Sequence, residues 1–253
     1  MKKAPMTTYQ KVMRTIGIAV AILCVLLAIS FSPRLKNYIT NITTNAEMLV
    51  TPAVNTKIPL AEQSESSKIY KVNKGKPDFT KSELSLNSGS AWQSYSNLDQ
   101  AGRVTTVNVL IDKKTLKSKD FKSEITLVPL GFKEVAVGKK TKTGQLYERG
   151  QLLPTRLGGA TADTRNIFTA TNQLNQLLAK KTNQIADYLE SHPQNHVRYR
   201  ISTVYKDQEI IARGVCLEAQ SVEDNGLSFN VYLLNTQSGI VINYSTGEAK
   251  VIM

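Results

Sequence analysis

The chain has 253 residues, which allows one sizeable domain with additional segments. Its 32 Lys and Arg residues outnumber its 20 Asp and Glu residues, and the resulting formal net charge of +12 favours polyanionic partners: nucleic acid, an anionic membrane or an anionic wall polymer. With 2 cysteines in the whole chain, a disulfide framework is excluded, so the domain must be held by its own core.

The N-terminus has the pattern of a membrane signal anchor. Residues 1–14 contain basic but no acidic side chains, and residues 15–32, "TIGIAVAILCVLLAISFS", contain no charge. An uncharged segment of this length can span a bilayer, and basic residues on its short N-terminal side place that side in the cytoplasm. The sequence "AISFSPRLKN" is a poor cleavage site. We therefore predict an uncleaved single-pass transmembrane helix at the cell membrane, with the C-terminal domain extracellular.

A polar stalk or linker is predicted after the anchor. Residues 33–85 are rich in Ser, Thr, Asn and Lys and lack sustained hydrophobic periodicity, which is typical of a linker. The folded domain is therefore placed at residues 86–253. Cys24 falls within the anchor, and Cys216 is interpreted as a small buried apolar residue without a disulfide partner.

Strand patterns recur through the predicted domain. Residues 103–112 are rich in β-branched side chains and predict a strand. Three further stretches, 195–207, 209–221 and 227–247, read as antiparallel strands, because the separators "KDQ", "EDNG" and "TQSG" are typical turn sequences.

One long helix is predicted between these strands. Residues 166–190 carry apolar side chains at helical spacing, and His192-Pro193 follows as a stop signal. The apolar residues of this face are Leu174, Leu177, Leu178, Ile185 and Leu189. Strands, one long helix and then a meander indicate an α+β domain with an antiparallel sheet.

Several strings of the domain resemble a known family when they are taken in order. They are "SYSNLDQAGRVTTVNVLID", "PLGF", "YERGQLL", "NIFTATNQLNQ" and "SVEDNGLSFNVYLLNTQSGIVINYSTGEA", which fall within about residues 90–248. Their order and spacing are similar to those of the DNA/RNA non-specific endonucleases with a ββα-metal finger, and in particular to the membrane-anchored competence nucleases of Gram-positive bacteria. The resemblance implies a nuclease finger within the α+β fold.

The same resemblance implies metal-assisted hydrolysis of a phosphodiester. In the family, a His at the end of an Asp-Arg-Gly-His string takes a proton from water, and an Asn on the following helix holds one hydrated Mg²⁺. Here Glu148-Arg149-Gly150-Gln151 stands at that string. Arg149 is kept and can contact a phosphate, and Glu148 keeps the acidic charge. Gln151 replaces the catalytic base, and a carboxamide cannot accept a proton near neutral pH.

The helix that follows matches the family only in part. Asn166 and Asn175 match the two asparagines of the family string, and Asn175 takes the metal-ligand position. The family helix carries a Glu about two turns later, whereas residues 176–186 here contain no carboxylate, and Thr182, Asn183 or Gln184 takes that place. The nearby Lys180 and Lys181 are predicted to disfavour a cation. We therefore expect Mg²⁺ affinity to be reduced or lost.

Other residues that could bear on function are few. His192 and His196 follow the predicted helix and are interpreted as surface residues rather than substitute bases. Glu148 could replace the base only if burial raised its pKa. Arg198 and Arg200 alternate with apolar neighbours on a strand and are weak candidates for contacting nucleic acid.

Three functional hypotheses follow from the sequence. The first is a membrane-anchored, exported pseudonuclease that binds DNA, RNA or a protein and hydrolyses little or nothing. The next in rank is a cell-surface scaffold or regulatory module that binds a protein or an anionic wall polymer. The third is a working Mg-dependent endonuclease with altered base chemistry.

Overall fold

The computed structural model describes residues 68–86, 91–121 and 124–252. All of them lie in one compact unit, Val54–Met253. The predicted cytoplasmic tail, the predicted anchor at residues 15–32 and the first part of the predicted linker lie outside these ranges. Within them, no helix is both long enough and apolar enough to cross a membrane.

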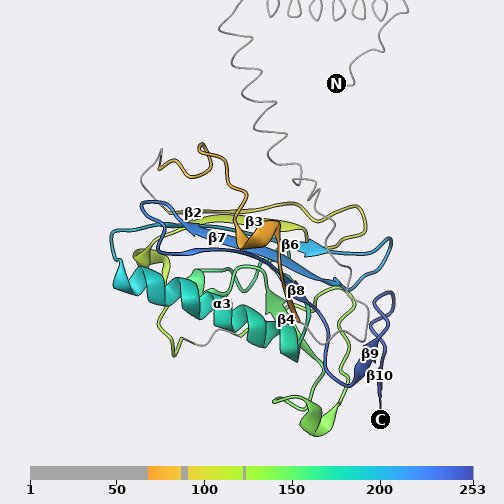
Figure 1. The fold of residues 1–253 in the computed structure, drawn as a ribbon. Coiled ribbons are helices and arrows are strands. Elements are labelled where there is room, and N and C mark those ends of the chain that lie inside the picture. Colours follow the sequence, from red (N-terminus) through yellow and green to blue (C-terminus); the bar gives the residue numbers. More distant parts are fainter. Residues whose placement is uncertain (1–67, 87–90, 122–123, 253) are drawn as a thin grey trace, which may run out of the picture. The chain divides into compact units, whose positions relative to one another are not determined.

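A six-stranded antiparallel sheet forms the centre of this unit (Figure 1). Its strand order is β1-β8-β7-β6-β3-β2, so the first strand along the chain and the second lie at opposite edges. The strands are β1 (Ile69–Lys71), β2 (Trp92–Tyr95), β3 (Thr106–Ile111), β6 (Val197–Val204), β7 (Gly214–Ser221) and β8 (Ser228–Leu234). This sheet confirms the predicted antiparallel architecture and its main strands.

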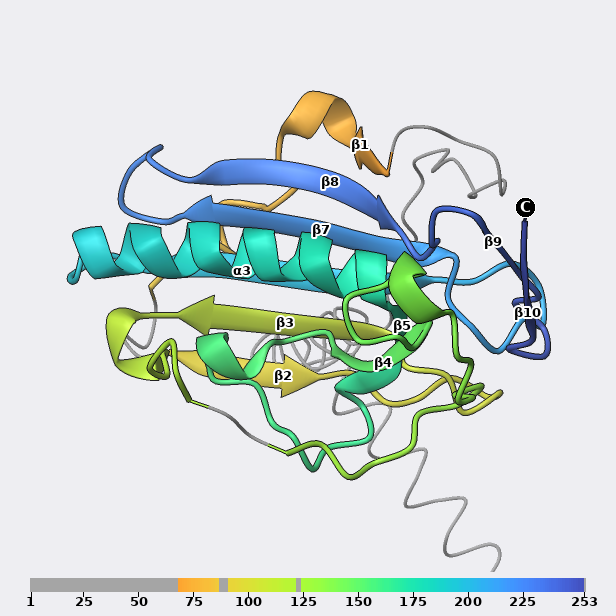
Figure 2. The same cartoon turned by 90° about the horizontal axis from the view of Figure 1, so that it is seen from below.

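Smaller elements surround the central sheet. Two strand pairs form separate two-stranded sheets: β4 (Tyr147–Gln151) with β5 (Ile167–Thr171), and β9 (Ile240–Ile242) with β10 (Ala249–Val251). The single α-helix of the described residues, α3 (Asn172–Ser191), runs along the strands of the central sheet (Figure 2). Short 3-10 turns occur at η1 (Asn73–Gly75), η2 (Lys113–Thr115), η3 (Gly138–Lys140) and η4 (Thr155–Leu157).

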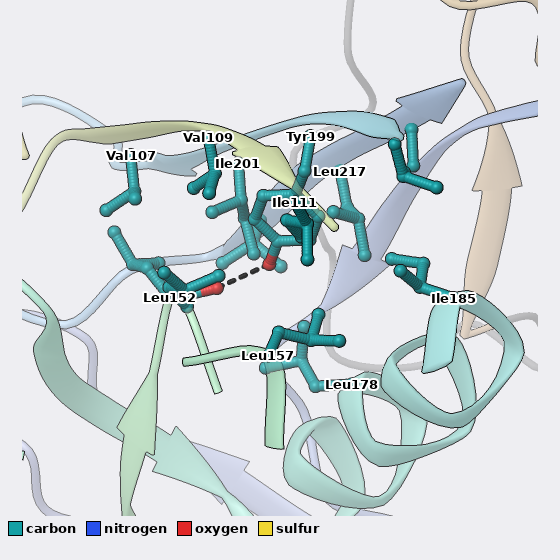
Figure 3. Close-up of a cluster of buried hydrophobic side chains, with 14 of the residues drawn as sticks. Val107, Val109, Ile111, Leu152, Leu157, Leu178, Ile185, Tyr199, Ile201 and Leu217 are labelled. Atoms are coloured by element: carbon teal, nitrogen blue, oxygen red, sulfur yellow. Dashed lines mark hydrogen bonds between the residues drawn. The ribbon is translucent and has the colours of Figure 1, made fainter. Parts of the chain in front are cut away.

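The main core lies between the central sheet and α3 (Figure 3). Alternate residues of β3 and β6 point into it, as the period of a strand requires, and Ile185 of α3 meets them fully buried. Leu152 and Leu157 enter the same core from the loop after β4. The Tyr199 hydroxyl donates a hydrogen bond to the Leu152 carbonyl, which ties this loop to the sheet. The core therefore fixes both α3 and the loop after β4.

The helix begins later than its predicted region. Residues 167–171, which we expected to be helical, form β5 and pair with β4. The apolar residues of this stretch fit a helical period, but its β-branched side chains also suit a strand, and the long-range partner decides between the two. The helical face is confirmed: Leu174, Leu178, Ile185 and Leu189 are buried, and Leu177 is partly buried against the same core.

The folded part also begins earlier than predicted, and this corrects the linker boundary at residue 85. β1 pairs with β8, with Tyr70 opposite Tyr232. Residues 76–84, which we call the strap, then run over the face of the sheet opposite to α3 (Figure 1). The strap packs against charged side chains and not against an apolar core, so its sequence is polar. A polar sequence of this kind resembles a linker.

Those charged side chains are Arg198, Arg200 and Glu218. The Arg200 guanidinium donates to Glu83 Oε1 at 2.7 Å and to Glu218 Oε1 at 2.6 Å, and it lies 4.8 Å from the centre of the Phe79 ring. The Asp78 backbone N–H donates to Glu218 Oε2 at 2.7 Å. The strap is therefore held by a network of ion pairs, which is unusual for a largely covered surface and depends on the carboxylates being ionised.

The stability of this network is predicted to depend on pH through Glu83. Burial opposes ionisation of Glu83, but hydrogen bonds from Thr80 and the charge of Arg200 outweigh it and hold the pKa of this carboxyl below its ordinary value of 4.5. A depressed carboxyl pKa contributes stability above the unfolded value that is lost as the pH falls through the folded value. Urea unfolding should therefore show Glu83→Gln to be less stable than wild type at neutral pH. The difference between the two proteins should begin to shrink as the pH falls below about 4.5 and should disappear below the lowered pKa of folded Glu83, and a constant difference would contradict the assignment.

Candidate functional site

A strand pair and a helix start form one unit at the edge of the core. β4 pairs with β5 so that Gln151 lies opposite Ile167 and Tyr147 lies opposite Thr171. Thr171 ends β5 and caps α3, since its hydroxyl accepts a hydrogen bond from the Leu174 backbone N–H at 3.1 Å. This junction brings the first turn of α3 beside β4, and a ββα arrangement results.

Glu148 of β4 joins the strand to the helix. Its Oε2 accepts a hydrogen bond from Asn175 Nδ2 at 2.7 Å, and its Oε1 accepts one from Asn172 Nδ2. A carboxylate only accepts, so the NH₂ group of each amide must face it. The carbonyl oxygen of Asn175 is left without a hydrogen-bond partner among the residues that the structure describes. Glu148 therefore orients Asn175, with this oxygen as its remaining free ligand atom.

Gln151 holds the loop that follows β4. Its Oε1 accepts from the Thr155 backbone N–H at 3.2 Å and from the Thr155 hydroxyl at 2.9 Å. Its Nε2 donates to the Ala160 carbonyl at 3.3 Å. Because an amide oxygen has two lone pairs, both acceptor positions of Gln151 are taken within the protein. The side chain thus has no acceptor left to orient a water.

Asn166 holds the same loop from the start of β5. It is fully buried, and its Oδ1 accepts from the Leu153 N–H at 2.7 Å. Its Nδ2 donates to the Leu153 carbonyl at 3.0 Å and to the Ala160 carbonyl at 2.7 Å. Gln151 and Asn166 therefore share the Ala160 carbonyl, and together they fix residues 152–160 next to β4.

An open groove of about 740 Å³ runs along this unit. Glu148, Gln151 and Asn175 all line it, so the structure brings these three predicted positions together. Four cationic side chains line it as well, and the one carboxylate among the lining residues is that of Glu148: the four are Lys119, Lys142, Arg149 and Arg156. Arg156 is ion-paired with Glu190, so the excess of positive charge comes from Lys119, Lys142 and Arg149. A groove with this excess of positive charge is suited to an anionic ligand.

Part of the Arg149 guanidinium makes contacts within the protein. Its Nε donates to the Leu127 carbonyl at 3.0 Å, and its guanidinium lies 4.9 Å from the centre of the Phe132 ring. No other guanidinium N–H group of Arg149 has a hydrogen-bond partner among the described residues, and Arg149 lines the groove. Arg149 is thus held in place, and it can still offer donors to a phosphate.

The structure selects among the helix positions that the sequence left open. Thr182 and Asn183 line the groove, whereas Gln184 accepts a hydrogen bond from Lys181 away from it. Thr182 is buried and donates to the Leu178 carbonyl at 2.9 Å, as a helical Thr often does. Lys181 lies over the Phe229 ring at 4.2 Å, so its charge points to the core side rather than to the groove.

The remaining predicted residues lie elsewhere. His192 stacks on Tyr188, and His196 pairs with Glu223 at 2.6 Å. Arg198 is buried under the strap and donates to the Val109 carbonyl at 3.0 Å. The structure does not bring Arg198 or Arg200 to the groove, because both belong to the face of the sheet opposite to α3.

The groove offers oxygen ligands to a divalent cation, but few of them. Among the described residues there is no cluster of three or more His, Cys, Asp and Glu side chains that could hold a metal. Glu148 and the Asn175 carbonyl oxygen are adjacent, and one carboxylate with neutral oxygens and waters is a donor set that Mg²⁺ accepts. The residues present therefore fit a largely hydrated Mg²⁺ held by few protein atoms.

Several groove residues escaped the sequence reasoning. The sequence pointed to Asn172 only in that it follows the residue that caps a helix. Lys142 and Arg156 belong to no recognisable motif. Lys119 and Phe121 follow a predicted strand at no fixed spacing. Their common location depends on how the loops fold over β4, which no local pattern records.

Comparison with known proteins agrees with this arrangement. A family model described as DNA/RNA non-specific endonuclease matches residues 84–223. The crystal structure of NucA from Streptococcus agalactiae with no metal bound is 23% identical, covers 88% of this chain and 98% of that chain, and has a TM-score of 0.63. The magnesium-bound NucA structure is 21% identical, with coverages of 84% and 96% and a TM-score of 0.62. Sda1 nuclease with bound zinc ion is 18% identical, with coverages of 72% and 96% and a TM-score of 0.57. These structures share the fold.

The loop clamp can be tested by removing Asn166. Asn166→Ala leaves the Leu153 N–H and the Leu153 carbonyl without their partner in a buried place, while the Ala160 carbonyl keeps its bond from Gln151. We expect a loss of about 3 kcal/mol in the free energy of unfolding. Asn183→Ala is the matched control, since Asn183 is exposed on the same helix-lined groove. It should change stability by no more than about 0.5 kcal/mol. Equal urea midpoints for the two variants would rule out the clamp.

Proposed function

Because the chain belongs to the DNA/RNA non-specific endonuclease family, we propose that its groove binds nucleic acid but hydrolyses it slowly or not at all. The observation that carries this proposal is Gln151, which stands at the base position and has both acceptor sites of its amide oxygen occupied by Thr155. The protein is then a pseudonuclease that keeps the binding surface of its family.

The missing base is the first support for this proposal. Hydrolysis of a phosphodiester requires removal of a proton from the attacking water, and a positioned base contributes about 10²–10⁴-fold to such a step. Gln151 has no basicity near neutral pH. Glu148 is the nearest alternative, but both of its oxygens hold the amides of Asn172 and Asn175. The histidines of the described residues do not line the groove.

The second support is the donor set for a cation. A bound Mg²⁺ would neutralise charge on the phosphate and on the leaving oxygen. Asn175 and Glu148 are the residues that would hold it here, and Glu148 would at the same time keep the Asn175 carbonyl oriented. The helix positions further along the groove, Thr182 and Asn183, add no carboxylate, so we propose a weakened affinity for the metal.

Binding of nucleic acid rests on charge and shape. The groove carries Lys119, Lys142 and Arg149 against the carboxylate of Glu148, while Arg156 is paired with Glu190. Contacts of this kind with phosphates release counterions and make the affinity depend on salt rather than on sequence. The sequence of residues 1–32 further supports export, with residues 1–14 in the cytoplasm, a membrane anchor at residues 15–32 and the groove presented outside the cell.

The loss of the base is tested by restoring it. The full chain, Gln151→His, Gln151→Ala and Gln151→His/Thr182→Glu are incubated with plasmid DNA in Mg²⁺ or Mn²⁺. We expect wild type and Gln151→Ala to be equally slow, and the His variants to cut at least about 10²-fold faster, because a base is available again. Adding Asn175→Ala should abolish the restored cutting.

Two outcomes would overturn the proposed loss of activity. Rapid cutting by wild type that Gln151→Ala abolishes would make the chain a working endonuclease with altered base chemistry. A rate that rises steeply with pH would support the same conclusion, since hydroxide or Glu148 would then act in place of the base.

The binding surface is tested by salt dependence. Lys119→Gln/Lys142→Gln removes two groove cations, and Lys206→Gln/Lys250→Gln removes two exposed cations outside the groove. Fluorescence anisotropy over a range of KCl concentrations should show the slope of log K against log salt reduced by about 1 for each groove lysine. The control pair should leave the slope unchanged. Absence of any binding at low salt would favour a surface scaffold for a protein or a wall polymer instead.

A further inference from the structure

An aromatic ring stands exposed in the cationic groove. Phe121 lines the groove together with Lys119 and Gln151, and 51% of its surface is accessible. Among the described residues, no other ring and no cation stacks on it. Exposing a phenyl ring to water is unfavourable, so a ring left open inside a binding groove points to a ligand that covers it.

The backbone presents this ring at a defined place. The Phe121 N–H donates to the Ser118 carbonyl at 3.1 Å, which closes a turn. Just before that turn, the Lys117 N–H donates to the Arg156 carbonyl at 3.0 Å, and the Arg156 side chain donates back to the Lys117 carbonyl. The turn is thus tied to the loop after β4, the same loop that Gln151 and Asn166 hold. The backbone that carries Phe121 is therefore held beside the groove.

The surroundings of the ring match the two parts of a nucleotide. Lys119 and Lys142 can neutralise phosphates, while Phe121 offers a flat apolar face. The exposed amides of Gln176 and Asn183 line the same groove and can hydrogen-bond to base edges. Cations along a backbone with an aromatic platform between them are the features of a site for unpaired bases.

A second aromatic ring continues the groove past β4. A neighbouring hollow of about 390 Å³ shares Thr143, Glu148 and Arg149 with the main groove and is also lined by Phe132. Arg149 lies over Phe132, so a cation and an aromatic ring meet there as well. Apolar surface therefore lies on both sides of Glu148, whereas the excess of positive charge belongs to the main groove, because the hollow also carries the Glu134 carboxylate.

We propose that Phe121 is a base-stacking residue and that the preferred ligand of the groove is single-stranded nucleic acid. In a duplex the faces of the bases are stacked on one another and are closed to a protein ring, whereas in a single strand they are open. The inference rests on the proposed binding of nucleic acid, and it adds which form is bound. The chemistry is shared by DNA and RNA, since every base has such a face.

The test compares single strands with a duplex in EDTA, so that no hydrolysis occurs. Affinities of the full chain in mild detergent are measured by anisotropy for labelled oligo(dT), oligo(rU) and a hairpin duplex of equal charge. Phe121→Ala and Phe121→Leu should weaken binding of single strands by roughly 5- to 100-fold and leave the duplex unaffected. Phe121→Trp should retain single-strand binding, because the aromatic face is preserved. Val128→Ala, an exposed apolar residue outside the groove, is the control.

A spectroscopic signal distinguishes base stacking on residue 121 from a distortion of the groove by the substitution. The chain has 1 tryptophan, Trp92, so Phe121→Trp in a Trp92→Phe background places the only indole in the groove. Its fluorescence should be quenched by oligo(dT) or oligo(rU) and not by the duplex. Quenching by oligo(dT) alone or by oligo(rU) alone would support the proposal and would identify DNA or RNA, respectively, as the ligand.

The results that overturn the inference differ from those that overturn nucleic-acid binding. If Phe121→Ala or Phe121→Leu bound single strands as tightly as the wild type does, base stacking would be excluded. Salt-dependent binding of nucleic acid would still stand. Equal affinity of wild type for the duplex and for single strands would exclude the preference. Failure of the wild-type chain to bind any nucleic acid would remove the proposed function together with this inference.

Discussion

Thr171 joins the parts on which the groove depends. Its N–H donates to Asn235 Oδ1 at 2.8 Å, its hydroxyl donates to the Thr236 carbonyl at 2.8 Å, and the same hydroxyl caps α3. One buried residue thus ends β5, starts the helix and attaches both to the segment after β8. Since β4 is paired with β5, the position of Glu148 against Asn175 follows from this junction. The direction of α3 across the sheet follows from it as well.

The groove shows how one position can serve either chemistry or structure. A catalytic base must keep a lone pair directed at the attacking water. The Gln151 amide oxygen instead accepts two hydrogen bonds from Thr155, and its Nε2 donates to the Ala160 carbonyl. Glu148 is used in a similar way, because its charge is taken up by two amides of the helix. Gln151 therefore holds a loop and Glu148 holds the start of a helix, so both side chains of this site make structural contacts.

Sequence patterns predicted the elements whose signal is local. The apolar period of α3 and the β-branched runs of β3, β6, β7 and β8 follow from side chains that a single core buries. β1 and β2 have few residues, and β1 lies in a polar stretch, so only their pairing with distant strands reveals them. The stretch 167–171 was misread for the same reason, because its partner β4 decides its conformation.

The candidate site was predictable where a motif existed and not elsewhere. Glu148, Gln151 and Asn175 were found through the family resemblance, and their contacts could not be foreseen because they depend on rotamers at the strand–helix junction. Alternation along β6 indicated that Arg198 and Arg200 share a face, yet it could not say which face, and the strap that covers them carries no periodic signal. Phe121 is one ring in a polar loop, and only the folded loop shows it beside the cations.

The strap has a mechanical consequence for a chain that continues before residue 68. Tension applied through that part of the chain first reaches β1, a three-residue edge strand, and then the contacts of the strap, which are the Asp78 N–H bond to Glu218 and the ion pair of Glu83 with Arg200. These contacts lie on the face of the sheet opposite to α3, and β4 and the loop after it are not among them. We therefore expect peeling of the edge strand to precede any distortion of the groove.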